Sequence, residues 1–94
     1  MSRPAAVYLT DRARKDLERL PSGHRQQIIE GLRRLGAGHS LDVKRLRGYR
    51  PPVYRMRSGD FRILFRRGEA SVHILAIIDR QDLERELTRL FGGG

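Results

Sequence analysis

Arginines alternate with apolar residues in the middle of this 94-residue chain, and they are its first candidates for chemistry. Arg55 and Arg57 occupy every second position before a Ser-Gly-Asp sequence, and Arg62 and Arg66 flank Leu64 in the same way after it. Successive side chains of a β-strand point to opposite faces, so each segment predicts a strand with one apolar and one largely basic face. A guanidinium group can pair with two phosphate oxygens. The basic face therefore indicates contact with a polyanion or with water.

The residues between the two segments predict a tight turn. Gly59 can adopt the positive φ angles that two-strand hairpins often need. We therefore expect a β-hairpin over residues 53–65, and its apolar face requires a cover that the rest of the chain must supply.

The overall charge points to anionic partners. Twenty lysines and arginines against eleven acidic residues give a formal charge of +9 and a pI near 11.3. Such a field favours nucleic acid, a ribosome, an anionic membrane or an acidic protein as partner. The chain has no cysteine, its first eight residues lack the apolar run of a signal peptide, and no window could span a bilayer. We expect a cytoplasmic protein that does not bind membranes.

The three histidines do not predict a metal centre. His24, His39 and His73 fall in different segments, and none forms a pair at metal-ligand spacing. We expect neither a metal nor another cofactor. His73 lies in an apolar run, so we interpret it as a core residue rather than a catalytic one.

Helical spacing of apolar residues predicts the cover for the hairpin. A strand over residues 5–9 leads to a helix that Thr10 caps and Pro21 ends. Ser22 then caps a second helix, which exits at Gly36. Two helices joined so closely predict an antiparallel helical hairpin.

The remaining segments complete the order of elements. Residues 37–52 carry glycines and prolines, and we expect them to be irregular. Residues 72–78 are apolar apart from one histidine, which is typical of a central strand covered on both faces. Asp79 can cap a last amphipathic helix, and residues 92–94 should form a frayed tail.

The predicted order is β-α-α-β-β-β-α, an α+β fold in a single domain over residues 1–94. A small antiparallel-rich sheet is packed by the N-terminal helical hairpin and accompanied by a C-terminal helix. The basic strand face, the basic segment 44–50 and the start of the last helix are expected to converge on a groove.

The central motif resembles a known family. Residues 54–65, YRMRSGDFRILF, are similar to the "YRLRVGDYRVIY" core of the RelE/ParE toxin superfamily of type II toxin–antitoxin systems. Residues 44–48, KRLRG, resemble the family's "KPLKG" segment, and the resemblance extends over nearly the whole chain. It implies a RelE-like fold.

The resemblance also implies a function. RelE-like members are ribosome-dependent endoribonucleases that cut mRNA without a metal, and ParE-like members poison DNA gyrase. A cognate antitoxin neutralises both. We expect a toxin that cleaves mRNA on the ribosome and binds an antitoxin; the alternatives are a non-catalytic gyrase inhibitor and a catalytically decayed homologue that retains antitoxin binding.

By position in the motif, the resemblance assigns catalytic roles to Arg62, Arg55 and Arg80, of which Arg80 matches an arginine of the family's "GHRRDVY" segment. Cations there would stabilise the phosphorane formed when the 2′-OH attacks the adjacent phosphate. The fourth candidate catalytic residue is Glu84. The candidates for binding RNA or the ribosome are Lys44, Arg45, Arg47, Arg50 and Arg57.

This chain departs from the family at its proton-transfer groups. Asp79 stands where many members have histidine, and Glu84 stands where RelE-like members have a catalytic tyrosine. Glu84 or Asp82 could serve as the base that accepts the proton of the 2′-OH. The leaving 5′-oxygen then has no evident proton donor unless Tyr49 or Tyr54 supplies the proton.

Overall fold

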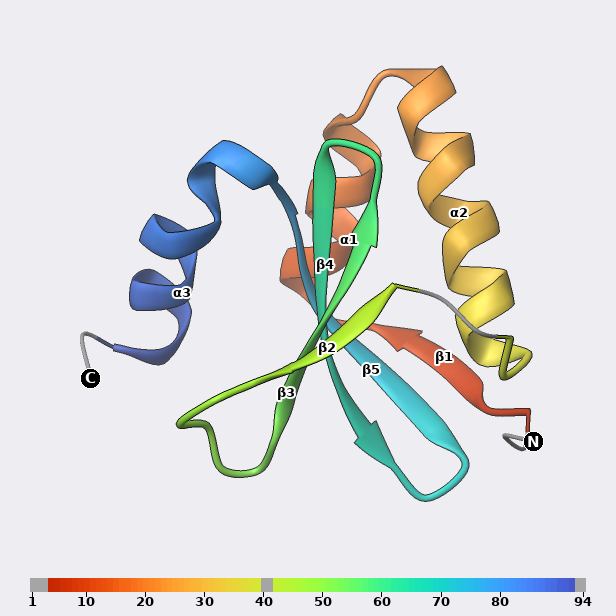
Figure 1. The fold of residues 1–94 in the computed structure, drawn as a ribbon. Coiled ribbons are helices and arrows are strands. Elements are labelled where there is room, and N and C mark those ends of the chain that lie inside the picture. Colours follow the sequence, from red (N-terminus) through yellow and green to blue (C-terminus); the bar gives the residue numbers. More distant parts are fainter. Residues whose placement is uncertain (1–3, 40–41, 93–94) are drawn as a thin grey trace.

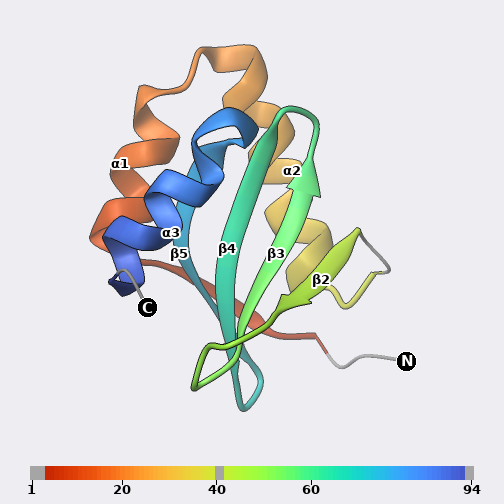
Figure 2. The same ribbon diagram turned by 60° about the vertical axis from the view of Figure 1, so that its left-hand side comes forward.

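The computed structural model describes residues 4–39 and 42–92, which form a five-stranded sheet with helices on both faces (Figures 1 and 2). The elements are β1 (Ala6–Leu9), α1 (Asp11–Arg19), α2 (Ser22–Gly36), β2 (Val43–Leu46), β3 (Val53–Ser58), β4 (Phe61–Gly68), β5 (Ser71–Asp79), a single 3-10 turn (Arg80–Asp82) and α3 (Leu83–Phe91). The strand order is β1-β5-β4-β3-β2, with β1 parallel to β5 and the other pairs antiparallel. The predicted α+β fold is confirmed. In the described ranges, no helix is long and apolar enough to cross a bilayer.

The N-terminal helical hairpin forms as predicted, with one change at its second cap. The Thr10 side chain accepts a hydrogen bond from the Ala13 backbone N–H and caps α1. The predicted cap of α2 at Ser22 is wrong, because Pro21 occupies the N-cap position without a side-chain hydrogen bond and Ser22 is the first helical residue. Proline fits this boundary because its fixed φ suits the start of a helix and it has no N–H to satisfy.

The segment 37–52 is not wholly irregular, and this expectation was wrong for β2. Residues Val43–Leu46 pair antiparallel with β3, so that Lys44 lies opposite Arg55. A four-residue strand shows too little alternation to be recognised alone, and it forms because β3 supplies its hydrogen-bond partners. The sheet therefore has one strand more than predicted, and this strand forms a charged edge.

The two faces of the sheet bury two separate cores. The helical hairpin packs against one face, where Ile63, Phe65 and Ile74 are fully buried. Helix α3 covers part of the other face, over Leu64 and Ala76. The predicted covering of the apolar face by the hairpin is confirmed, but α3 also covers part of the face that was predicted to be basic.

A bulge in β5 allows that strand to serve both cores. Leu64 pairs with Ala76 and Phe65 with Ile74, so Leu75 has no partner in β4. The extra residue shifts the alternation of β5, which explains why its apolar run is nearly continuous. The predicted central position of this strand is confirmed, because β5 lies between β1 and β4.

His73 is not the core residue that the sequence predicted. It is exposed, and its ring stacks on Tyr8 of β1 at 5.3 Å. The sequence predicted that both faces of this strand are covered along its whole length. Helix α3 packs over β5 only at Ala76 and Ile78, so His73 stays uncovered on the same face.

Alanine at Gly36 is expected to lower the free energy of unfolding by about 1–3 kcal/mol, the usual range for overpacking. A Cβ there would lie 2.8 Å from Val7 Cγ2 and 3.0 Å from the Ala5 carbonyl oxygen, so β1 would have to shift away from the end of α2. Gly23→Ala in the same helix is the matched control, because a Cβ at that position meets no atom within 4 Å. Urea denaturation of both variants measures the difference, and equal stabilities would contradict the close packing of β1 on α2.

Candidate functional site

Four arginines from three segments meet on the sheet face that α3 partly covers. Arg57 lies opposite Arg62 in the β3–β4 register, and Arg55 lies opposite Leu64, which packs under α3. Arg80 follows β5 directly, and its backbone N–H donates to the Asp60 carbonyl oxygen at 2.8 Å. We call Arg55, Arg57, Arg62 and Arg80 the arginine cluster. Arg57, Arg62 and Arg80 lie close to the β3–β4 turn, which is at the upper end of the sheet in Figure 1, and Arg55 lies further along β3.

Arg62 lies at the centre of the cluster and is held by the turn beside it. Its Nη1 donates to the carbonyl oxygens of Gly59 at 2.9 Å and Phe61 at 3.0 Å. Partial burial lowers the pKa of Arg62, and repulsion from Arg57, Arg55 and Arg80 lowers it further. An anion bound at this point would relieve that repulsion.

Two carboxylates offset part of the positive charge. Asp42 lies 3.7 Å from Arg55 Nη2, and Asp60 lies 3.7 Å from Arg80 Nε. Both acidic side chains are more than half exposed. Such long, solvated ion pairs contribute little energy. A phosphate group can therefore compete with them for the arginines.

The sequence did not single out Asp42 as a member of this site. Its side chain approaches Arg55, and its carbonyl oxygen accepts a hydrogen bond from the Arg57 N–H at 2.9 Å. The segment was expected to be irregular, so nothing placed Asp42 beside β3. A polar residue just before a short alternating stretch was the one available signal.

The predicted proton-transfer residues lie elsewhere. Glu84 is exposed on α3, and in the described part of the chain no hydrogen bond or ion pair links its side chain to the arginine cluster. Tyr54 lies on the opposite face of the sheet, stacked on Phe65 at 5.5 Å. Tyr49 packs against Phe91 at 4.9 Å, on the far part of α3.

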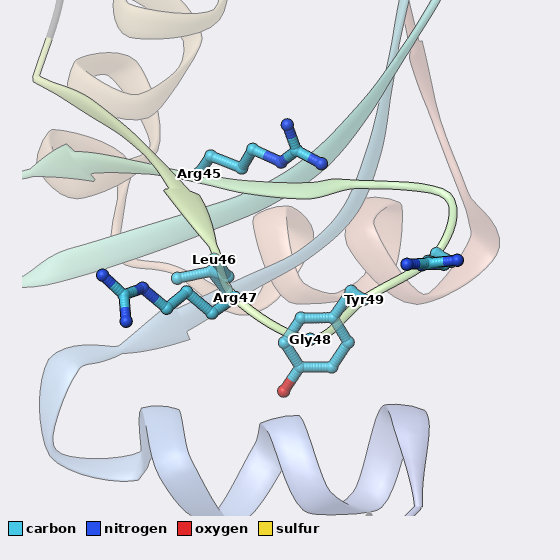
Figure 3. Close-up of a pocket in the computed structure, with 6 residues that line it drawn as sticks. Arg45, Leu46, Arg47, Gly48 and Tyr49 are labelled. Carbon is cyan, nitrogen blue, oxygen red and sulfur yellow. The ribbon is translucent and has the colours of Figure 1, made fainter.

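The predicted RNA-binding residues do not form one surface. Lys44 lies opposite Arg55 and faces the cluster side, whereas its neighbour Arg45 lies opposite Tyr54 on the other face. Arg47 and Arg50 belong to the connection between β2 and β3. Together with Arg45 and Tyr49 they line an open hollow of about 810 Å³ (Figure 3), so three of the five predicted residues gather there.

A network of charged side chains fixes α3 above the sheet. Arg12 of α1 pairs with Asp16 through Nε at 2.9 Å and with Glu86 of α3 through Nη2 at 2.9 Å. Asp16 also accepts a hydrogen bond from the Ile77 N–H at 2.9 Å, next to the β5 bulge. The sequence did not reveal this network, because Arg12 and Glu86 are 74 positions apart. It joins α1, β5 and α3, and so it holds the helix that follows Arg80.

Burial and hydrogen bonding act on Glu86 in opposite directions. Only 9% of its side chain is exposed, and burial alone raises the pKa of its carboxyl group. Hydrogen bonds from Arg12 and Arg89 outweigh this effect and hold the pKa below its usual range. Glu86 is therefore ionised at neutral pH.

Residues 7–84 match the family described as ParE toxin of type II toxin–antitoxin system, parDE. The structure resembles that of the RelBE2 toxin–antitoxin complex from Mycobacterium tuberculosis, with 27% identity, a TM-score of 0.75 and coverage of 87% of this chain and 98% of that chain. A RelB–RelE complex from Methanococcus jannaschii shares the fold at 23% identity, with a TM-score of 0.67 and coverage of 84% of this chain and 96% of that one. The comparison with curated proteins gives no match.

Proposed function

The chain belongs to the ParE toxin family of type II toxin–antitoxin systems, within the RelE/ParE superfamily, and we propose that it inhibits translation by cutting mRNA on the ribosome. The observation that carries this proposal is the arginine cluster. Four guanidinium groups meet two carboxylates there, which leaves an excess of positive charge on a rigid sheet face. RNA phosphate is the anion that this arrangement fits best.

In this proposal the cluster holds the phosphate on the 3′ side of the scissile nucleotide. The 2′-oxygen attacks phosphorus and loses its proton, the bond to the 5′-oxygen breaks, and that oxygen takes up a proton. The products carry a 2′,3′-cyclic phosphate and a 5′-hydroxyl. Arg62 and its neighbours stabilise the dianionic phosphorane between these steps.

Charge stabilisation is the part of catalysis that the geometry supports. The described residues place no imidazole or phenol on the cluster, whereas Asp42 and Asp60 contact its arginines. We assign proton acceptance from the 2′-OH to one of these two carboxylates rather than to the exposed Glu84.

One observation favours a second function, inhibition of DNA gyrase without catalysis. The matching family is described as ParE toxin, and the sequence lacks the tyrosine and histidine of RelE-like enzymes at Glu84 and Asp79. In that case the arginine cluster would bind an acidic surface of gyrase.

Two assays distinguish mRNA cleavage from gyrase inhibition. The first is a purified translation reaction with mapping of mRNA ends, and the second is a gyrase supercoiling assay. Our proposal predicts new mRNA ends that require ribosomes, at toxin concentrations that leave supercoiling unchanged. Loss of supercoiling with intact mRNA would establish the second function. A catalytically decayed homologue would be inactive in both assays.

We also propose a cognate antitoxin as partner, since the similar structures are toxin–antitoxin complexes. An apolar hollow of about 260 Å³ lies over the helical hairpin and β1. Ile29 on its wall is 43% exposed, and the chain as a whole carries a charge of +9. An acidic amphipathic segment fits such a surface.

Ile29→Glu is expected to weaken antitoxin binding by about 10- to 100-fold, the scale of a central apolar contact. The new carboxylate would be buried against apolar atoms and would repel an acidic partner, while the toxin loses little stability because the side chain is half exposed. Titration calorimetry with the antitoxin encoded beside the toxin measures the effect, with the exposed Arg19→Ala as control. Unchanged affinity of the glutamate variant would place the antitoxin elsewhere.

A further inference from the structure

A row of aromatic and basic side chains crosses the sheet face at the end opposite the arginine cluster. Tyr8 stacks on His73 at 5.3 Å, and His73 lies opposite Arg66 in the β4–β5 register. The Arg66 guanidinium carbon lies 5.4 Å from the centre of the Phe91 ring, and Phe91 contacts Tyr49 at 4.9 Å. We call these five residues the aromatic row.

The row extends across the sheet. Tyr8 belongs to edge strand β1, His73 to β5, Arg66 to β4, and Tyr49 to the connection between β2 and β3. Neighbouring strands are about 4.8 Å apart, so the row is roughly 15–20 Å long. The β4–β5 turn beside it is at the lower end of the sheet in Figure 1, whereas the β3–β4 turn, close to Arg57 and Arg62, is at the upper end.

One end of the row presents an open aromatic surface. Tyr8 is 54% exposed, although a tyrosine side chain is mostly apolar. One face of its ring contacts His73, and the other faces the free edge of β1, where the sheet has no further strand. That second face can accept another flat ring.

The centre of the row has an unsatisfied cation. Arg66 forms no ion pair within the described residues, and its buried Nε has no hydrogen-bond acceptor there. No acidic side chain in the described ranges therefore offsets the charge of this guanidinium group. Arg47 and Arg50 line the hollow beside Tyr49 and add positive charge at the other end of the row.

We propose that the aromatic row binds a single strand of nucleic acid, with a base stacked on Tyr8 and the backbone directed towards Arg66, Arg47 and Arg50. Stacking on aromatic rings combined with cations along the backbone is the usual chemistry of single-strand binding. A protein partner would have to cover the same cations with carboxylates, and it would have no need for a flat ring at the sheet edge.

This site is separate from the arginine cluster and does not depend on the proposed cleavage. The two lie on the same face of the sheet, on either side of the part that α3 covers at Leu64 and Ala76. Binding to a free oligonucleotide is measured without ribosomes and without any chemical step. Failure of the proposed cleavage would therefore leave this test intact.

Fluorescence anisotropy with a short labelled RNA of mixed sequence tests the proposal. Tyr8→Ala is expected to weaken binding about 5- to 100-fold, the scale of losing one base–aromatic stack. Tyr8→Trp should bind at least as well as the wild type. Leu9→Ala is the matched control, because it shortens the next side chain of β1, on the opposite face, and should leave binding unchanged.

An abasic strand of the same length separates stacking from charge attraction. It carries the same phosphates without bases, so Tyr8→Ala should leave its affinity unchanged. Equal losses for RNA and for the abasic strand would overturn the proposal. It would also be overturned if Tyr8→Ala bound RNA like the wild type, including the case in which the variant weakened only antitoxin binding.

Discussion

Arg62→Ala is expected to slow mRNA cleavage on programmed ribosomes by roughly 30- to 1000-fold, which corresponds to about 2–4 kcal/mol of transition-state stabilisation. The side chain lies at the centre of four guanidinium groups and is fixed by two carbonyl oxygens of the adjacent turn. A donor held in place before the reaction needs no reorganisation as charge develops on the phosphorane. Single-turnover cleavage at saturating ribosome concentration measures this step directly.

The matched variants separate charge from geometry. Arg62→Lys should recover only part of the rate, because an ammonium group cannot form the paired contacts of a guanidinium group. Arg19→Ala removes one exposed arginine at the end of α1 and should cleave like the wild type. If Arg62→Ala were as fast as Arg19→Ala, the cluster would have no part in the chemistry.

The structure changes one expectation for the stability of Arg62→Ala. From the sequence, the side chain was expected to extend away from the core and to affect the melting temperature little. Its two hydrogen bonds to Gly59 and Phe61 hold the β3–β4 turn, so we expect a loss of about 1 kcal/mol. Kinetic comparisons therefore belong well below the melting transition.

Glu86→Gln is expected to lower the free energy of unfolding at neutral pH by about 1.5–3 kcal/mol, the range for hydrogen bonds to charged groups. The wild-type carboxylate accepts hydrogen bonds from Arg12 at 2.9 Å and Arg89 at 3.3 Å while it is almost buried. The amide keeps the size of the side chain but loses its charge. Chemical denaturation over a range of pH measures the effect.

The pH dependence gives this prediction a distinct signature. The folded-state pKa of Glu86 lies below its unfolded value, so its contribution is complete above the unfolded pKa of about 4.3 and is lost as the pH falls through the folded value. The two proteins should therefore converge in stability under acid conditions. Glu84→Gln, on an exposed side chain of the same helix, should match the wild type throughout. A difference for Glu86→Gln that stayed constant with pH would contradict the proposed ion pairing.

The sequence predicted the elements whose patterns are long and local. Alternation in β3 and β4, the cap at Thr10 and the helical spacing in α1 and α2 were sufficient to place them. It missed β2 because four residues carry too short a pattern and because the strand depends on pairing with β3. His73 was wrongly predicted to be buried, because the apolar run that contains it continues through the part of β5 that α3 covers, whereas His73 lies beyond that part.

Some residues of the site could be predicted from local sequence patterns, and others could not because their positions depend on contacts between distant segments. Arg55, Arg57 and Arg62 follow from strand alternation and the turn between them, so their common face could be predicted. Asp42 and the pairing of Arg12 with Glu86 depend on contacts between distant segments, which no local pattern contains. The same limit explains why Lys44 and Arg45, adjacent in sequence, were predicted to bind together but lie on opposite faces.

Chemical analysis of mRNA ends after incubation with programmed ribosomes tests the central proposal most directly. The arginine cluster is proposed to stabilise attack by the 2′-OH, so the upstream fragment should end in a 2′,3′-cyclic phosphate and the downstream fragment should begin with a 5′-hydroxyl. Both ends should be strongly reduced with Arg62→Ala. Intact mRNA with the wild-type toxin, in a preparation that blocks gyrase supercoiling, would contradict the account.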